Sequence, residues 1–355
     1  MPPESISTRK AEHIALCETD EVAFQRKSTL LEQVELVHDA LPEMALADVD
    51  LSCDYAGKRL RAPLFIAAMT GGTDQAEEIN RDLALVAERH GIGFGFGSQR
   101  PLLQEGLTKG YQVRDVAPTT LVLGNIGLVQ ARESSTDALR RMCDSCGADA
   151  LVVHLNPAME IIQPGGDVDF REGLQTLERL VRELERPVVV KETGCGLSRS
   201  VGQRVAELGV EWVDTSGAGG TSWVGVEALR ARGAQRRLGD RFWDWGIPTA
   251  ASVAQLADLG LGICATGGLT DGLDVAKAIA LGARVGGIAR SFLQARARGG
   301  VEGLDAEVEQ VLAELRFAHL LTGSRTPDEL RQRPLVLGER LRRWVPTGCS
   351  LEARC

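Results

Sequence analysis

Short apolar runs alternate with amphipathic stretches along the chain from about residue 62 onward. The apolar runs lack a clean apolar–polar alternation, which is typical of strands buried on both faces of a parallel sheet. Helical periodicity separates them, for example over 77–88, 174–184 and 275–280. Repeated strand–helix units favour a closed (β/α)8 TIM barrel of the α/β class over an open sheet. The predicted strands span 62–69, 92–97, 120–125, 150–156, 187–192, 212–216, 262–266 and 284–288.

Two segments differ from this repeat. The residues before the first predicted strand are rich in charge, with a cluster between Arg9 and His13. The stretch 217–247 is too long for an ordinary loop after a barrel strand, and long loops at that position usually carry function. We therefore predict an N-terminal arm or lid over residues 1–61, a barrel over 62–325 and a charged C-terminal tail packed on the barrel over 326–355.

Composition narrows the possible partners. The formal net charge of −9 argues against a broad nucleic-acid surface. The N-terminus lacks an apolar signal core and no apolar run reaches membrane-spanning length, so we expect a cytoplasmic protein without a membrane partner. Among the eight cysteines, only Cys143 and Cys146 form a CxxC pair. Because that pair lies in a helical pattern and follows no strand, ordinary reduced thiols are favoured over a redox motif.

Glycine pairs mark the ends of the last two predicted strands. Gly267 and Gly268 follow the seventh strand, and Gly286 and Gly287 lie in the eighth, shortly before Arg290. Tight turns alone would also use glycine. However, backbone N–H groups at these two strand ends commonly hold a phosphate in barrels of this class. Adjacent glycine pairs therefore favour the phosphate of a cofactor.

A lysine at a strand end is a second candidate for chemistry. Lys191 closes the apolar run VVVK on the fifth predicted strand. Lysine is seldom buried without a partner. It could pair structurally with Glu192 or Asp214, or it could supply positive charge to an electron-rich cofactor ring. Because active sites gather on this face of a barrel, we favour the functional interpretation.

Seven short motifs occur in order along the chain. They are RKAEH (9–13), AAMTGGT (67–73), GSQR (97–100), HLN…E (154–160), VKETGCGLS (190–198), SGAGGTSW (216–223) and ATGG (265–268). Taken together and in this order, they resemble the type 2 (FMN-dependent) isopentenyl-diphosphate delta-isomerases, over about residues 7 to 340. The last motif is shared with FMN-dependent 2-hydroxy-acid oxidases, so it supports the flavin more than the reaction.

The resemblance implies an isomerase of isoprenoid biosynthesis that interconverts isopentenyl diphosphate and dimethylallyl diphosphate. It implies FMN, active in its reduced form, with NADPH as the reductant and Mg²⁺ on the diphosphate of the small prenyl substrate. It also implies a homo-oligomer, a tetramer or an octamer. The charges fit, since Arg, Lys and a divalent metal compensate a diphosphate. A lysine beside the flavin favours its anionic reduced form.

The resemblance also implies a role for individual residues. Lys191 and His154 would act in catalysis, and Glu160 would carry Mg²⁺. The flavin ring and ribityl chain would contact Ala68, Met69, Thr70, Ser98, Asn125, Lys191, Ser216 and Thr221. The flavin phosphate would contact Gly267, Gly268, Leu269, Ala289 and Arg290. The substrate would contact Arg9, Lys10, Ser98, Gln99, Arg100, His154, Asn156 and Met159.

Simpler interpretations exist for several of these residues. His154 could be a core histidine bonded to backbone, and Glu160 could lie on a solvated helix face. Arg9, Lys10 and His13 could form a solvated terminal charge cluster, which is what most such clusters are. Their occurrence in the family's order favours the functional assignment.

The sequence departs from the family pattern at one site position. Met159 stands directly before Glu160, where the family has a glutamine that contacts substrate and is a proposed participant in proton transfer. Methionine has no exchangeable proton and accepts hydrogen bonds only weakly. Gln163 lies four residues further on and is not assumed to replace it. A milder change follows, because the usual proline–glutamate–glycine is Pro-Gly-Gly at 164–166.

Several functions therefore remain open. The flavin could carry both proton steps, the chain could act on a different allylic or phosphorylated substrate, or it could bind FMN and prenyl diphosphate with low turnover. An FMN-dependent 2-hydroxy-acid oxidoreductase would place a histidine base near the flavin. The five histidines stand at 13, 38, 90, 154 and 319, none of them between the sixth and seventh predicted strands. The oxidoreductase is therefore the weaker alternative.

Overall fold

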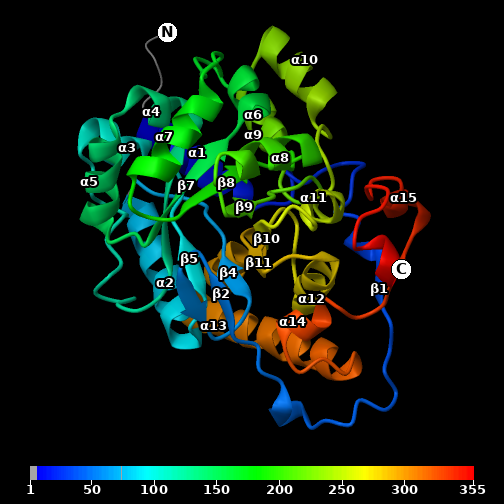
Figure 1. Cartoon of the computed structure of the whole chain (residues 1–355). Coiled ribbons are helices and arrows are strands. Elements are labelled where there is room, and N and C mark those ends of the chain that lie inside the picture. The colour runs from blue at the N-terminus through cyan, green and yellow to red at the C-terminus, as the bar shows by residue number, and fades with distance from the viewer. Residues whose placement is uncertain (1–5, 73) are drawn as a thin grey trace.

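A closed barrel of eight parallel strands forms the centre of the computed structural model, which describes residues 6–72 and 74–355 (Figure 1). Around the barrel the strands follow one another in chain order, and β11 pairs with β4 to close it. All eight predicted strands are present, so the (β/α)8 prediction is confirmed. They are β4 (Leu64–Ile66), β5 (Gly93–Gly95), β6 (Val122–Gly127), β7 (Ala150–Leu155), β8 (Val188–Glu192), β9 (Trp212–Asp214), β10 (Gly262–Ala265) and β11 (Val285–Ile288).

Helices between the strands cover the outside of the barrel (Figure 1). Several begin at a side-chain cap that satisfies a free backbone N–H. Ser135 accepts from the N–H of Ala138, and Asp271 accepts from that of Asp274. The helices are α2 (Asp74–His90), α3 (Arg100–Glu105), α4 (Leu128–Glu133), α5 (Thr136–Cys146), α6 (Pro157–Ile162), α7 (Gly173–Glu183), α8 (Arg199–Glu207), α9 (Trp223–Arg230), α10 (Gly233–Phe242), α11 (Thr249–Leu256), α12 (Gly272–Leu281) and α13 (Arg290–Leu321).

The long segment 217–247 is not an irregular loop. It contains α9 and α10, which pack against each other and against α6. Ser222 caps α9 by accepting from the N–H of Gly225 and donates its hydroxyl to the carbonyl of Trp243, which ties the two ends of the segment together. The functional insertion predicted from its length is therefore a helical pair beside β9.

A β-hairpin closes the amino end of the barrel. It consists of β2 (Cys53–Tyr55) and β3 (Lys58–Leu60). Tyr55 is 1% exposed and makes edge contacts with Phe65 and Trp212, at ring-centroid distances of 6.3 and 5.0 Å. Together with inward side chains of the strands, the hairpin forms one apolar cluster, separate from the larger cluster between strands and helices. This end of the barrel is thus packed shut by side chains.

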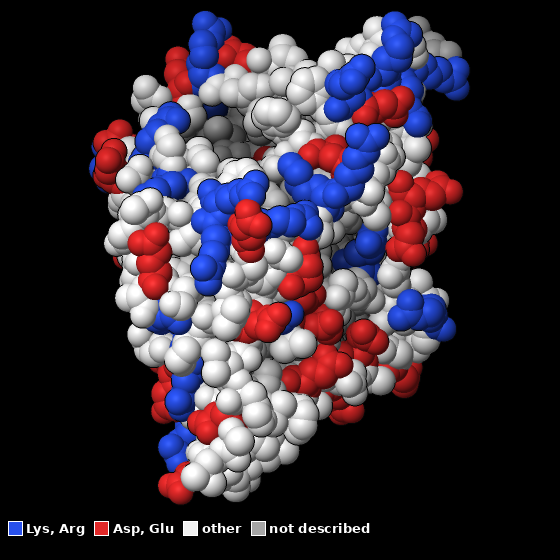
Figure 2. All heavy atoms as spheres, turned by 90° about the vertical axis from the view of Figure 1, so that its right-hand side faces the viewer, with Lys and Arg blue, Asp and Glu red and all other residues white. Residues whose placement is uncertain are grey.

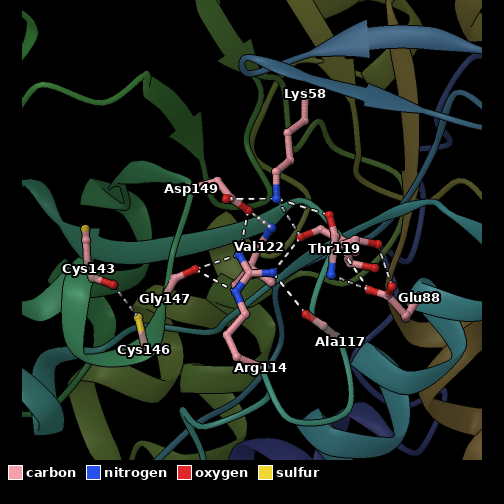
Figure 3. Close-up of polar contacts among 11 residues, drawn as sticks. Lys58, Glu88, Arg114, Ala117, Thr119, Val122, Cys143, Cys146, Gly147 and Asp149 are labelled. Carbon is pink, nitrogen blue, oxygen red and sulfur yellow. Dashed lines mark hydrogen bonds and ion pairs between the residues drawn. The ribbon is translucent and has the colours of Figure 1, made fainter.

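A polar network surrounds the same end (Figure 3). Arg114 donates to the carbonyls of Ala117, Thr120 and Gly147 and to Asp149, at 2.6–3.0 Å. The other oxygen of Asp149 lies 2.9 Å from Lys58 Nζ. These bonds join the hairpin to the segments that lead into β6 and β7, so they fix strand positions rather than form an open site.

The N-terminal arm and the C-terminal tail both pack on the barrel. In the arm, α1 (Ile6–Cys17) lies over the carboxyl end, and β1 (Val34–Leu36) pairs antiparallel with β12 (Leu335–Leu337) of the tail. The tail also contains α14 (Pro327–Leu330) and α15 (Glu339–Arg342). The division into arm, barrel and tail remains an interpretation, because these parts share one core.

Two surface features bear on possible partners. Figure 2 shows one face, on which basic and acidic side chains are mixed and form no continuous basic surface. Within 6–72 and 74–355, no helix combines the length and the apolar character needed to cross a bilayer.

Candidate active site

A cavity of about 280 Å³ opens at the carboxyl end of the barrel. Its walls come from the ends of the barrel strands, from α1 above them and from α6 and α9 at the side. Twenty of the twenty-one residues that the resemblance implies line this cavity. Residues up to 281 positions apart, from Arg9 to Arg290, therefore meet in one place, as the strand-end argument predicted.

Gln99 is the residue that the structure does not bring to the cavity. It is fully buried, and its Nε2 donates to Cys146 Sγ of α5 at 3.2 Å. Its Oε1 accepts from the backbone N–H of Asn125 at 2.8 Å. The Gln99 side chain, expected to contact substrate, is turned toward α5 and lies outside the cavity lining, and both of its polar ends are used within the fold.

The glycines after β10 form a tight backbone cradle. Gly267 and Gly268 have φ of +102° and +88°, which side chains rarely tolerate. A Cβ on Gly267 would lie 2.2 Å from the carbonyl oxygen of Gly217, and one on Gly268 would lie 2.6 Å from Thr29 Cγ2. Only glycine fits at either position, so the backbone can approach a bound group closely.

Two polar groups in the cavity wall are buried without a hydrogen-bond partner among the described residues. They are Thr70 Oγ1 and Arg290 Nη1. The second terminal nitrogen of Arg290, Nη2, lies 3.9 Å from Oδ1 of Asp20, an exposed carboxylate. Of the buried polar atoms without a partner among the described residues, these two are the ones that line the cavity, where a ligand could accept from Arg290 and bond Thr70.

Lys191 is paired with Asp214 and also lines the cavity. Its ammonium lies 3.6 Å from Asp214 Oδ2 and donates to the carbonyl of Glu192 at 2.8 Å, while the side chain lines the cavity. Burial raises the pKa of Asp214, although Lys191 and the hydroxyl of Thr266 act in the opposite direction. Burial likewise raises the pKa of Glu192 to about 8. The cavity therefore has a lysine held at its base.

His154 is held as a neutral imidazole. Its Nδ1 lies 2.8 Å from Asn125 Oδ1. Burial, together with the positive charges of Lys191 and Lys10, lowers the pKa of His154 to about 3. It is therefore not a core histidine bonded to backbone but a cavity residue that bonds a side chain and feels the charges of Lys191 and Lys10.

The α6 segment brings a carboxylate to the cavity wall. Glu160 is 8% exposed; its Oε1 accepts from Asn156 at 2.8 Å and its Oε2 from the N–H of Asp167 at 2.8 Å. Gln163 also donates to Oε2, at 3.3 Å, and lines the cavity. Met159 lines it too. Glu160 is thus not on a solvated face, and Gln163 is a cavity residue that sequence reasoning left unassigned.

The arm contributes cations to the rim. Lys10 Nζ donates to the carbonyls of Gly71 and Ser98 and to Tyr111 Oη, at 2.6, 2.7 and 2.9 Å. These acceptors use all three N–H donors of the ammonium. Burial lowers the pKa of Lys10 to about 7 and also lowers the pKa of Arg9. Lys10 therefore holds α1 on the barrel. It could bond a diphosphate only if it gave up one of these three acceptors.

Three further residues at this rim were not assigned from sequence. His13 Nε2 lies 2.8 Å from Glu227 Oε1, and its ring meets Trp223 edge-on at 5.5 Å. Glu227 is fully buried in α9. His13 and Trp223 fall inside the quoted motifs, which is the signal that could have found them, whereas Glu227 lies outside every motif.

Comparison with known proteins decides the family. A relative from Synechococcus sp. named isopentenyl-diphosphate delta-isomerase is 46% identical over 338 residues, covering 94% of this chain and 97% of the relative. Relatives of the same name from Halobacterium salinarum and Methanothermobacter thermautotrophicus are 42% and 41% identical, each with at least 96% of both chains covered. The chain belongs to the isopentenyl-diphosphate delta-isomerase family.

Two further comparisons agree with this family. The sequence profile of the FMN-dependent dehydrogenases matches residues 4–164 and 165–337. Among solved structures, a mandelate oxidase variant with (S)-mandelic acid superposes with a TM-score of 0.67, at 20% identity and with 93% of this chain and 94% of that chain covered. At that identity, the structural likeness shows the barrel fold alone. The family match supports FMN as the cofactor.

The residues present fit FMN. The cradle at Gly267 and Gly268 would hold its phosphate beside Arg290, whose unpartnered Nη1 needs an acceptor. Thr70 offers a hydroxyl without a partner among the described residues, and Lys191 offers positive charge in the same cavity. Each of these groups is buried in a wall that the family's cofactor would cover.

The residues also fit Mg²⁺ on a bound diphosphate. Glu160 uses three of its acceptor directions within the protein, which leaves one for a cation. No group of three or more metal-ligating side chains occurs at the cavity among the described residues. A single carboxylate is enough where Mg²⁺ takes one or two carboxylates and completes its shell with phosphate and water.

Proposed function

We propose that this chain interconverts isopentenyl diphosphate and dimethylallyl diphosphate, with FMN reduced by NADPH and with Mg²⁺ on the substrate. The observation that carries the proposal is a single cavity that joins an anion cradle, a lysine at its base and a cationic rim. Relatives 41–46% identical over nearly the whole chain bear the name of this reaction.

The protein's own residues would bind and orient. Arg9 and Arg100 line the cavity and would hold the diphosphate, with Glu160 carrying Mg²⁺. Lys191 would place a positive charge against the flavin ring and favour its anionic reduced form. Reduced FMN would supply an electron-rich ring that stabilises a cation-like state and a nitrogen that exchanges the proton. No net redox change results from this isomerisation.

The arm would exclude water from the site. Helix α1 covers the cavity through Lys10 and through the His13–Glu227 pair. Excluding water strengthens electrostatic stabilisation of a cation-like state and prevents its capture by solvent. We also propose that the protein is cytoplasmic and assembles as a tetramer or octamer of identical chains, which gel filtration with light scattering would test.

A second candidate function follows from Met159. Because this side chain lines the cavity beside Glu160, the cavity has a thioether where the family pattern has an amide. A related allylic or phosphorylated substrate, or binding with low turnover, would be compatible with that change. A 2-hydroxy-acid oxidoreductase is less compatible, since His13 and His154 are the only histidines that line the cavity in the described chain.

The test is an anaerobic assay of the purified protein with isopentenyl diphosphate, Mg²⁺ and FMN reduced by NADPH. We expect dimethylallyl diphosphate to form over many turnovers while NADPH is consumed only once per flavin. Oxidation of NADPH in step with product would instead indicate an oxidoreductase. Replacing Glu160 with glutamine should raise the Mg²⁺ concentration needed for half-maximal rate, and an unchanged metal titration would remove the metal assignment.

A further inference from the structure

A chain of buried hydrogen bonds runs behind the cavity from α5 to His154. Gln99 makes two hydrogen bonds to the backbone of Asn125. Its backbone N–H donates to the Asn125 carbonyl at 2.7 Å, and its side-chain Oε1 accepts from the Asn125 N–H at 2.8 Å. Its Nε2 ends on Cys146 Sγ. Gln99 is fully buried and touches no cavity space, so its side chain acts on the site only through Asn125.

The side chain of Asn125 can lie in only one orientation. Its Nδ2 donates to the carbonyl of Phe96 at 2.9 Å. Because a carbonyl can only accept, the amide nitrogen must face Phe96, and Oδ1 must face His154. Oδ1 can only accept as well, and it lies 2.8 Å from Nδ1. The proton of neutral His154 therefore sits on Nδ1, and Nε2 carries a lone pair.

That lone pair has no partner among the described residues. The His154 side chain lines a cavity in which most of the charged side chains are cations. In the register of the sheet, His154 of β7 lies opposite Lys191 of β8 on one side and opposite Gly127 of β6 on the other. The charged side chains that line the cavity with it are Arg9 and Lys10 on α1, Arg100 on α3, Glu160 on α6, Lys191 on β8 and Arg290 on α13.

We propose that Gln99 and Asn125 are positioning residues that fix His154 in the Nδ1–H tautomer, and that Nε2 takes up one proton from solvent when a diphosphate binds. A diphosphate oxygen cannot bond an unprotonated Nε2, because both are acceptors. Once protonated, Nε2–H donates to that oxygen, and the anion compensates the new positive charge beside Lys191 and Lys10. The proton-uptake half rests on the proposed function, whereas the tautomer half does not.

The tautomer is measured directly in FMN-bound protein labelled with ¹⁵N-histidine. The chain has five histidines, so long-range ¹H–¹⁵N spectra remain interpretable, and His154→Gln identifies the signal. At pH 7.5 we expect His154 to show a protonated Nδ1 and an unprotonated Nε2. A protonated Nε2 in the free protein would overturn the assignment.

Variants around Gln99 test positioning against mere packing. Gln99→Met keeps the size but removes the acceptor of the Asn125 N–H, so the His154 signal should shift toward a mixture with the Nε2–H tautomer. Gln99→Glu keeps that acceptor and should restore the native signal. Cys146→Ala removes the thiol at the other end and should leave the signal unchanged. A native His154 signal in Gln99→Met with full FMN occupancy would refute the positioning role.

Proton uptake is tested with inorganic pyrophosphate and Mg²⁺ in the same protein. On saturation, the His154 signals should move to those of an imidazolium, with both nitrogens protonated. For each unit of pH increase, the apparent Kd for pyrophosphate should rise about tenfold more in native protein than in His154→Gln. That difference is the linkage expected for the uptake of one proton. If calorimetry shows that pyrophosphate does not bind, both the proposed function and the uptake step fail. If it binds while His154 stays neutral, only the uptake step fails.

Discussion

The two ends of this barrel use polar residues in opposite ways. At the amino end, all of the N–H groups of Arg114 have acceptors, and both oxygens of Asp149 are bonded. At the carboxyl end, Arg290 Nη1 and Thr70 Oγ1 are buried with no partner among the described residues. The same residue type, arginine, is thus saturated in one place and left open in the other.

The difference separates stability from function within one fold. The bonded network around Arg114 fixes the strands, whereas unpartnered groups that line a cavity are available to a ligand. The hydroxyls of Tyr55 and Thr120 are also buried without a partner among the described residues, but they lie in the packed amino end and do not line the cavity. Changes at the amino end should therefore cost stability and leave ligand affinity alone. Changes at the carboxyl end should lower ligand affinity and leave the stability of the protein alone.

The largest expected effect is at the amino end. Arg114→Met would take one donor from Asp149, which keeps Lys58 and the N–H of Val122, and would remove the Arg114 donors of three backbone carbonyls. Both partners of the Arg114–Asp149 pair are partly exposed, so we expect a loss of about 3 kcal/mol, the upper end for hydrogen bonds to charged groups. Urea unfolding should show this loss, while the FMN affinity of the folded fraction stays native. A loss below about 1 kcal/mol would show that the network does not stabilise the barrel.

The next effect is expected at Met159 in the cavity. Met159→Gln adds an amide that can bond the diphosphate or flavin, worth about 1.5–3 kcal/mol to a charged group, or roughly ten- to a hundredfold in rate if it acts at the transition state. Deuterium exchange from solvent into isopentenyl diphosphate should rise accordingly, with unfolding unchanged. No exchange in either protein, with reduced FMN and Mg²⁺ present, would end the isomerase proposal.

A smaller, pH-dependent effect is expected at Glu88, again at the amino end (Figure 3). Burial acts to raise its pKa, but bonds from Thr119 and Thr120 outweigh it and lower the pKa to about 2. A depressed pKa contributes stability above the unfolded value near 4.5, and that stability is lost as pH falls toward 2.

Glu88→Gln should remove this contribution. We expect a loss of about 1 kcal/mol at pH 7, as for a few partly exposed hydrogen bonds, and none near pH 2. Thermal unfolding of both proteins across that range measures it. A loss of equal size at both ends of the range would mean that the charge of Glu88 plays no part.

The sequence predicted the strands and the cavity residues better than it predicted individual contacts. The carboxyl ends of all strands lie at one face of a parallel barrel, whatever the individual side-chain contacts are. Lys191, His154 and Gly267 could therefore be placed together. Gln99 was misplaced because neighbouring residues of a motif point in different directions once α3 begins. Glu227 was missed because its partner His13 is more than 200 residues away, and only the docking of α1 brings them together.

The most direct test of the open carboxyl end is a flavin titration of apoprotein with FMN and with riboflavin, which lacks the phosphate. If Arg290 and the glycine cradle await that phosphate, native protein should prefer FMN by at least about a hundredfold, from two or more charged hydrogen bonds. In Arg290→Met the preference should fall by about tenfold or more, with unfolding of the apoprotein unchanged. Equal affinity for the two flavins in native protein would contradict the account.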